Sequence, residues 1–209
     1  MARFLPFSDR EDAGRRLAAR LPALDSPIVL ALPRGGVPVA AAVARAIGAT
    51  LDVFVVRKLG VPVQPELAMG AVASGGVRVL NENVLREAGV SSDVLQEATA
   101  RELGAVASRE RLYRGDRPEP ALAARDVVLV DDGLATGATM RAAVAAVRVH
   151  EPSRVVVAVP VAPAETVAAF VEDGLEIACV HVPKDFVSVG SWYRDFGQVT
   201  DEEVIRLIS

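Results

Sequence analysis

The chain has 209 residues, of which 51% are hydrophobic, so it is long and apolar enough to form one sizeable core in a single globular domain. Its net charge is −4 and its basic residues are dispersed, which argues against a nucleic-acid partner. The single cysteine, Cys179, excludes a disulfide within the chain and favours a reducing cytoplasm. No apolar run approaches the roughly 18 residues of a membrane span, and the first residues lack an export-signal pattern, so we expect neither membrane insertion nor export.

The first part of the chain predicts a helix followed by a strand, a helix and a second strand. Ser8 with Glu11 is a capping-box pattern for a helix over about residues 9–21. The elements expected next are a strand at residues 28–32, an alanine-rich helix that ends near residue 48, and a strand at residues 51–56 that runs into Arg57 and Lys58.

Residues 59–76 interrupt this alternation. The segment contains two prolines and several glycines and has no helical period, so it predicts a long mobile loop with a short strand near residues 71–73. Long loops of this kind are often functional.

The second half of the chain returns to alternating strands and helices. The expected elements are strands at residues 77–81, 127–130, 155–159 and 177–180, helices between them, including one over about residues 93–113, and a last helix that Thr200 and Glu203 begin. Continuously apolar strands that alternate with helices predict an α/β fold, with a mainly parallel central sheet and helices on both faces. We expect this core to span about residues 28–180.

The segment VVLVDDGLATGAT, residues 127–139, joins a buried strand to two acids and a loop of small residues. Ligands of a parallel sheet bind at the carboxyl ends of its strands. Small residues at the start of the following helix allow backbone N–H groups to bind an anion. Asp131 and Asp132 can accept hydrogen bonds from two vicinal hydroxyls or help to hold a divalent cation. A phosphorylated sugar satisfies both halves of the segment.

This segment resembles the motif with which type I phosphoribosyltransferases bind 5-phosphoribosyl 1-diphosphate (PRPP), and the resemblance extends in order over roughly residues 28–199. It implies a Rossmann-like α/β domain with a small hood, and an enzyme that uses PRPP and Mg²⁺ to transfer a 5-phosphoribosyl group to a nitrogenous base with release of pyrophosphate. Asp131 and Asp132 would face the ribose hydroxyls and contact Mg²⁺ mostly through PRPP and water. The residues implied to hold the 5-phosphate are Ala135, Thr136, Gly137, Ala138 and Thr139. Gly133 departs from the family pattern, in which an aliphatic residue is usual.

Two further segments resemble the pyrophosphate site of that family. In LPRGG, residues 32–36, Arg34 would supply positive charge, while Gly35 and Gly36 would allow the backbone to approach the ligand closely. Arg57 and Lys58 resemble the basic pair that precedes the flexible loop of orotate-type enzymes, and residues 59–76 would be that loop. Taken alone, an ordinary glycine turn and a solvated basic pair are the alternatives. The residues with implied catalytic roles are Asp131, Asp132, Arg34 and Lys58.

The C-terminal segment PKDFVSVGSWYRDFGQ, residues 183–198, resembles the hood of purine-salvage members of the family. We expect the hood over about residues 181–200, with the N-terminal residues as an optional part of it. The implied base-binding residues are Phe186, Val187 and Trp192, with Tyr193 as an alternative stacking platform; aromatic packing within a small hood core is an equal alternative. Ala135 stands where hypoxanthine-guanine enzymes carry an aspartate, which disfavours a 6-oxopurine acceptor.

Two other functions are compatible with the sequence. A regulatory protein could bind PRPP without consuming it, and a hydrolase could pass the ribosyl group to water. Arg109, Arg111 and Arg114 could line an anion site, although a solvated helix face is the simpler interpretation. The acceptor base and the oligomeric state stay open, with a homodimer as one option.

Overall fold

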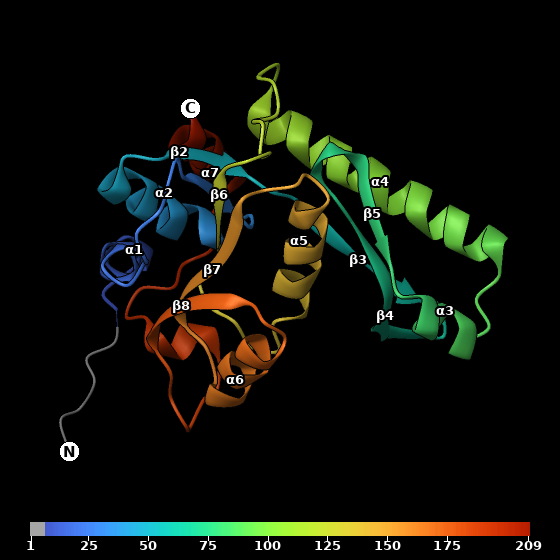
Figure 1. Cartoon of the computed structure of the whole chain (residues 1–209). Coiled ribbons are helices and arrows are strands. Elements are labelled where there is room, and N and C mark those ends of the chain that lie inside the picture. Colours follow the sequence, from blue (N-terminus) through green and yellow to red (C-terminus); the bar gives the residue numbers. More distant parts are fainter. Residues whose placement is uncertain (1–6) are drawn as a thin grey trace.

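A five-stranded parallel sheet forms the centre of the computed structural model, which describes residues 7–209. The strand order is β2-β1-β6-β7-β8 (Figure 1). These strands are β1 (Ile28–Ala31), β2 (Thr50–Val53), β6 (Asp126–Val130), β7 (Arg154–Val161) and β8 (Glu176–His181). The predicted α/β architecture with a mainly parallel central sheet is confirmed. Every β6 residue is buried, as expected for a strand that is covered on both faces.

Helices cover both faces of this sheet (Figure 1). They are α1 (Arg10–Ala18), α2 (Gly36–Ile47) and α7 (Asp201–Ile208) on one face, and α5 (Ala138–Arg148) and α6 (Ala164–Glu172) on the other. Side chains alternate along each strand, so Val128 packs with the first set of helices and Leu129 with the second. Within residues 7–209, no helix is both long and apolar enough to cross a membrane.

The first helix begins one residue later than the sequence pattern predicted. Asp9, not Ser8, is the N-cap residue, because its carboxylate accepts a hydrogen bond from the backbone N–H of Asp12 at 2.8 Å. The carboxylate of Asp12 in turn accepts a hydrogen bond from the backbone N–H of Ser8 at 3.1 Å. The last helix begins as predicted, since Thr200 accepts from the backbone N–H of Glu203 at 3.2 Å.

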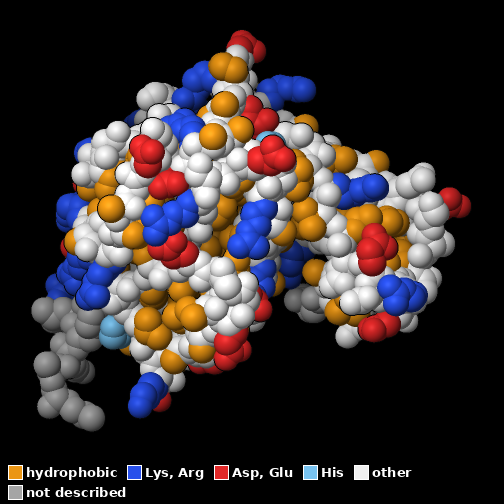
Figure 2. Space-filling model, viewed as in Figure 1, with side chains coloured by type: hydrophobic (Ala, Val, Ile, Leu, Met, Phe, Trp, Pro, Cys, Tyr) orange, Lys and Arg blue, Asp and Glu red, His pale blue; other side chains and the backbone are white. Residues whose placement is uncertain are grey.

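A second, antiparallel sheet projects from the side of the core. It contains β3 (Val56–Val61), β4 (Gln64–Ala73) and β5 (Val77–Leu80), followed by α3 (Glu82–Glu87) and the long α4 (Ser92–Arg114). This sheet packs against α4 and α5. Figure 2 shows a hollow between the main body and this projecting part.

The prediction that residues 59–76 form a loop is wrong, because most of the segment lies in β3 and β4. The prolines and glycines that suggested a loop instead allow a tight hairpin with irregular register at Leu59 to Val61. A Cβ atom on Gly60 would lie 2.5 Å from the backbone oxygen of Pro65, and one on Gly70 would lie 2.5 Å from that of Val79. Glycine is therefore required by the close approach of neighbouring strands.

Candidate functional site

Asp131 and Asp132 lie directly after β6, at the end of the sheet that is formed by the carboxyl ends of its strands. Ligands of such folds bind at this end. The backbone N–H of Asp132 donates a hydrogen bond of 2.8 Å to Oδ1 of Asp131. Burial, with the neighbouring charge of Asp132 adding to it, raises the pKa of Asp131 well above its ordinary value. Burial also raises the pKa of Asp132, although Arg10 opposes this effect. When both carboxylates are ionised, their negative charges are poorly solvated and repel each other. A bound cation or hydroxyl donors would stabilise the ionised pair.

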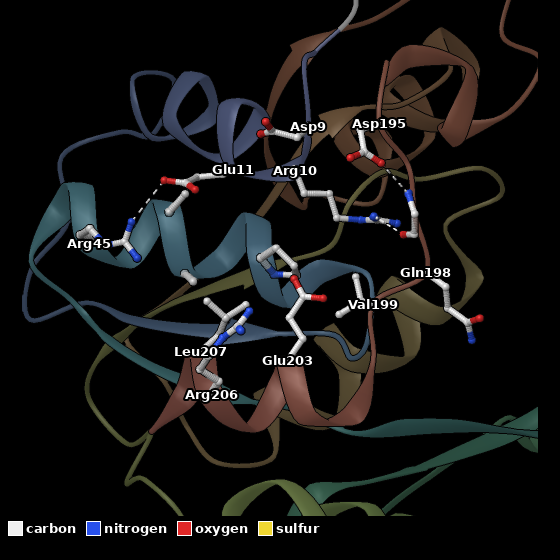
Figure 3. Close-up of a pocket in the computed structure, with 14 residues that line it drawn as sticks. Asp9, Arg10, Glu11, Arg45, Asp195, Gln198, Val199, Glu203, Arg206 and Leu207 are labelled. Carbon is white, nitrogen blue, oxygen red and sulfur yellow. Dashed lines mark hydrogen bonds and ion pairs between the residues drawn. The ribbon is translucent and has the colours of Figure 1, made fainter.

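Arg10, at the start of α1, contacts Asp132 of this pair. Its Nε atom lies 2.9 Å from Oδ2 of Asp132, and both side chains are largely buried, with exposed fractions of 12% and 15%. Its Nη1 atom donates to the backbone oxygen of Gly197 at 2.8 Å (the dashed line from Arg10 in Figure 3). Its guanidinium lies 3.9 Å from the ring centre of Phe196. The hydroxyl of Tyr193 donates to the backbone oxygen of Asp132 at 2.6 Å. Asp132 is therefore fixed from both the N-terminal helix and the hood.

The loop between β1 and α2 lies against the same carboxylates. A Cβ atom on Gly35 would lie 2.2 Å from Oδ2 of Asp132, and one on Gly36 would lie 2.7 Å from the backbone oxygen of Val130. Only glycine fits at these positions, because the acid pair and the strand occupy the space of a side chain. The peptide bond between Pro33 and Arg34 is cis. The structure therefore places Gly35 and Gly36 directly beside the acid pair.

The loop of small residues after the acid pair ends at the N-terminus of α5. Gly137 is the N-cap residue, with φ +74°, and it provides no side-chain cap for the first N–H groups of the helix. Its position is also crowded, because a Cβ atom would lie 2.5 Å from the ring of Phe170. The hydroxyl of Thr166 fixes the start of the loop by donating to the backbone oxygen of Ala135 at 2.6 Å. Thr136 and Thr139 are exposed, so this end of the helix presents N–H groups and hydroxyls to an anion.

The two predicted basic residues lie inside β3, not at the end of the second strand, and they face different spaces. Arg57 lines a cavity with Arg34 and Thr139, and its Nε atom lies 2.8 Å from Oε2 of Glu102. Lys58 lines a separate cavity of about 510 Å³ with Ala138 at the start of α5. Adjacent residues of a strand point to opposite faces, which separates the pair. Arg57 therefore lies beside the β1–α2 loop, while Lys58 lies near the start of α5.

The predicted hood contains the short helix η2 (Val189–Trp192) and packs against the N-terminal part of the described chain. Phe186 and Trp192 contact a small cluster of buried residues that includes Phe7 and Tyr193. The Trp192 ring also lies 4.5 Å from the ring of His181. Val187 is 85% exposed. The rings of Phe186 and Trp192 thus contribute to hood packing, while the side chain of Val187, whose backbone is the group implied to contact the base, faces solvent.

Gly133, the departure from the family pattern, has a structural explanation in the hood. A Cβ atom on Gly133 would lie 2.6 Å from Cγ1 of Val189 and 3.1 Å from Cγ1 of Val161. An aliphatic residue at position 133 would displace η2. Position 133 therefore requires glycine because η2 of the hood packs directly against the loop there.

Sequence reasoning did not identify Arg10 or Asp201 as residues of the site, and it favoured a solvated face for Arg109 and Arg114. Arg114 is instead buried and lies 3.0 Å from the carboxylate of Asp52. Arg109 and Arg111 are exposed, as the sequence favoured, and Arg109 lies 3.0 Å from Asp201. One sequence signal for Arg10 existed: a cation in the first turn of a helix opposes the helix dipole and so requires a partner elsewhere.

Comparison with known proteins gives consistent matches. Residues 8–173 match the family described as "Phosphoribosyl transferase domain". Two Mycobacterium tuberculosis proteins, MT0597 and Rv0571c, which are provisionally named as phosphoribosyl transferases, are 46% identical over 204 residues, or 97% of this chain. The chain spans only 46% of the length of these relatives.

Solved structures give the same fold. The protein TT1426 from Thermus thermophilus has 48% identity and a TM-score of 0.90, with 98% of each chain covered. A hypothetical protein from Neisseria gonorrhoeae with bound ppGpp has 12% identity and a TM-score of 0.53, with 97% of this chain and 93% of that one covered. A purine phosphoribosyltransferase from Pyrococcus horikoshii has 15% identity and a TM-score of 0.50, with 94% and 96% covered.

Proposed function

The chain belongs to the phosphoribosyl transferase domain family, and on that premise we propose that it uses PRPP and Mg²⁺ to transfer a 5-phosphoribosyl group to a nitrogenous base, with release of pyrophosphate. The observation that carries this proposal is that three polar segments lie together at the carboxyl ends of the parallel strands. These segments are the acid pair Asp131 and Asp132, the glycine loop after β1, and the uncapped start of α5.

Each segment suits one part of PRPP. The exposed threonines and N–H groups of residues 135–139 suit the 5-phosphate, because a helix N-terminus binds anions. Asp131 and Asp132 can accept hydrogen bonds from the two ribose hydroxyls. The diphosphate would lie against Gly35 and Gly36, with Arg34 and Arg57 as its cationic ligands. Lys58 lies near the start of α5 and would act from the phosphate side.

The residues present suit a Mg²⁺ ion that is bound mainly through the substrate. Among the described side chains of residues 7–209, which leave out Glu66, no group of three or more His, Cys, Asp or Glu residues could hold a metal ion by itself. Mg²⁺ in such sites takes one or two carboxylates and completes its shell with phosphate oxygens and water. Asp131 and Asp132 fit this role because their shared burial disfavours two uncompensated charges. When bound, Mg²⁺ would neutralise charge on the leaving pyrophosphate.

The reaction is a displacement at the anomeric carbon. The bond from that carbon to the pyrophosphate oxygen breaks, the acceptor nitrogen donates its electron pair to form the new bond, and the proton displaced from that nitrogen passes to solvent or to pyrophosphate. Positive charge develops on the ribose and negative charge on the leaving group. Asp131 and Asp132 would orient the ribose, while Arg34 and Arg57 would stabilise pyrophosphate. No covalent intermediate with the protein is needed.

The acceptor would bind beneath the hood. Phe186 and Trp192 offer aromatic surface and the backbone at Val187 offers polar groups, although both rings already pack against hood residues. Ala135 lacks the carboxylate that hypoxanthine-guanine enzymes use, so a 6-oxopurine is the least favoured base.

The test is pyrophosphate release from PRPP and Mg²⁺, with each nucleobase, orotate and nicotinate supplied separately and with a control that lacks a base. Release that depends on one base would establish the transferase and identify its acceptor. Base-independent release would indicate a hydrolase, and PRPP binding without release would indicate a regulatory protein.

A matched pair of variants tests whether PRPP binds at the acid pair. Asp132→Asn should weaken PRPP binding, whereas Asp116→Asn, at an exposed position outside the site, should not. Parent-like PRPP affinity in Asp132→Asn, or no PRPP binding by the parent protein, would contradict the proposed site.

A further inference from the structure

Three arginines from separate elements line one cavity beside the β1–α2 loop. The cavity has a volume of about 170 Å³, and its arginines are Arg34 from the loop, Arg57 from β3 and Arg109 from α4. Tyr113 and Thr139 also line it, and no acidic side chain does among those that the structure describes, which leave out Glu66. Each guanidinium is paired with a carboxylate outside the lining, Arg57 with Glu102 and both Arg34 and Arg109 with Asp201, so that the cavity itself is lined by cationic groups alone. Such a lining favours a multiply charged anion, which guanidinium groups can bind through paired N–H groups.

Arg109 is held in position by hydrogen bonds to two neighbours, Tyr113 and Asp201. Its Nη1 atom donates to the hydroxyl of Tyr113 at 2.7 Å and to Oδ1 of Asp201 at 3.0 Å. The Tyr113 hydroxyl donates to the same carboxylate oxygen at 2.7 Å, and Tyr113 is only 3% exposed. These bonds keep the guanidinium at the cavity wall through Nη1.

Asp201 also connects Arg109 to the loop after β1. Nη1 of Arg34 lies 3.8 Å from the same Oδ1 atom of Asp201 that binds Arg109. One carboxylate, from the first turn of α7, therefore lies between the two arginines without lining the cavity itself. This arrangement holds two positive charges near each other, which would otherwise repel.

We propose that Arg109 is a third arginine ligand of the diphosphate group, beside Arg34 and Arg57, and that Asp201 and Tyr113 are positioning residues that act through it. The inference rests on the proposed function, because it requires the diphosphate of PRPP to lie at the β1–α2 loop. Nε and Nη2 of Arg109 are the nitrogens that would face the ligand. The diphosphate subsite then extends from the parallel core to α4 and α7.

The experiment measures the affinity of the full chain for three probes in the presence of Mg²⁺: pyrophosphate, PRPP and ribose 5-phosphate. Arg109→Gln should weaken binding of pyrophosphate and PRPP by about tenfold or more, because one charge-assisted bidentate contact is lost. Binding of ribose 5-phosphate should change by less than about twofold, because its phosphate lies at the start of α5. Arg111→Gln is the matched control, since Arg111 is exposed on the same helix and does not line this cavity.

The outcomes separate the inference from the proposed function. Parent-like affinity of Arg109→Gln for pyrophosphate would overturn the role of Arg109 and leave PRPP binding intact. An equal loss for all three probes would overturn it too, because that result indicates general damage to the site. A parent protein that binds none of the probes would instead overturn the proposed function.

A second substitution covers the case in which Arg109→Gln does not fold. Arg109→Lys keeps the charge but loses the planar fork, so it should weaken pyrophosphate binding several-fold and leave ribose 5-phosphate binding unchanged. Parent-like affinity of Arg109→Lys for pyrophosphate would overturn the proposal. Tyr113→Phe should show the same selective effect with a smaller magnitude.

Discussion

Arg10 and Asp132 are separated by 122 positions in the chain and form an ion pair at the centre of the site, with Nε of Arg10 and Oδ2 of Asp132 2.9 Å apart. The pair connects the first turn of α1 to the end of β6. Under the proposed function Asp132 binds the ribose, and the N-terminal helix would then act on the ligand through this carboxylate.

We predict that Arg10→Gln weakens PRPP binding by about tenfold, since Asp132 loses the cation that keeps it ionised and oriented. Calorimetric titration with PRPP and Mg²⁺ measures this. Arg15→Gln on the same helix is the control, because Arg15 is 58% exposed and pairs with its neighbours in α1. Tighter binding by Arg10→Gln would show instead that Arg10 competes with the ligand for Asp132.

Asp131→Asn should make the protein more stable at neutral pH while weakening PRPP binding. Burial raises the pKa of Asp131 in the folded state, so the folded protein favours the protonated carboxyl group. The parent protein therefore loses stability as pH rises from the ordinary carboxyl value through the raised one. The variant lacks this loss and should be more stable by roughly 1–3 kcal/mol at neutral pH, a typical cost of an unfavourably buried polar group.

Urea unfolding of the parent protein and of Asp131→Asn at about pH 4 and pH 7 tests whether the variant is the more stable protein at neutral pH. The two proteins should be alike at the lower pH, where the parent carboxyl is protonated, and should diverge at the higher pH. Equal stability at both values would contradict an unfavourable charge at Asp131.

Gly35→Ala should destabilise the protein by roughly 1–3 kcal/mol, a typical cost of overpacking, and should reduce pyrophosphate binding. The reason is steric, because the added methyl group would lie 2.2 Å from Oδ2 of Asp132. Gly104→Ala is the matched control. Among the described residues, nothing lies within 4 Å of a Cβ atom there, inside α4, so the same change should stabilise the chain by about 0.5–1 kcal/mol. Thermal unfolding of both variants measures the contrast, and similar effects would argue against crowding at Gly35.

A double-mutant cycle tests the match between Gly133 and the hood. Gly133→Ala should cost roughly 1–3 kcal/mol, because the new methyl group would meet Val189 at 2.6 Å. In a Val189→Ala background the same change should cost much less, since the opposing methyl groups are gone. Denaturant unfolding of the four proteins gives the coupling energy. Additive effects would show that the contact does not explain the glycine.

The sequence allowed prediction of the segments whose signals are local. Residues 127–130 of β6 are continuously apolar, and the small residues before α5 are typical of a backbone that binds an anion, so local patterns predict both. Segment 59–76 was misassigned because Gly60 and Gly70 are explained by neighbouring strands, which a local pattern does not reveal.

The missed site residues share a similar cause. Arg10, Arg109 and Asp201 act through partners that are distant in the chain, and each has an ordinary helical context. Charged residues on helices are usually solvated, and this interpretation is wrong for Arg10, which is only 12% exposed, but holds for the exposed Arg109. Only the arrangement of α1, α4 and α7 around the sheet edge reveals their contacts.

The hairpin of β3 and β4 would reduce the conformational entropy that is lost when the substrate binds. A disordered covering loop must be ordered when the substrate binds, at roughly 1–2 kcal/mol of backbone entropy for each residue fixed. Residues 56–61 and 64–73 are already paired by backbone hydrogen bonds in the isolated chain. Any movement of this segment towards the ligand would then be a rotation of a formed unit, and more of the intrinsic binding free energy of PRPP would be left for orienting the anomeric carbon towards attack.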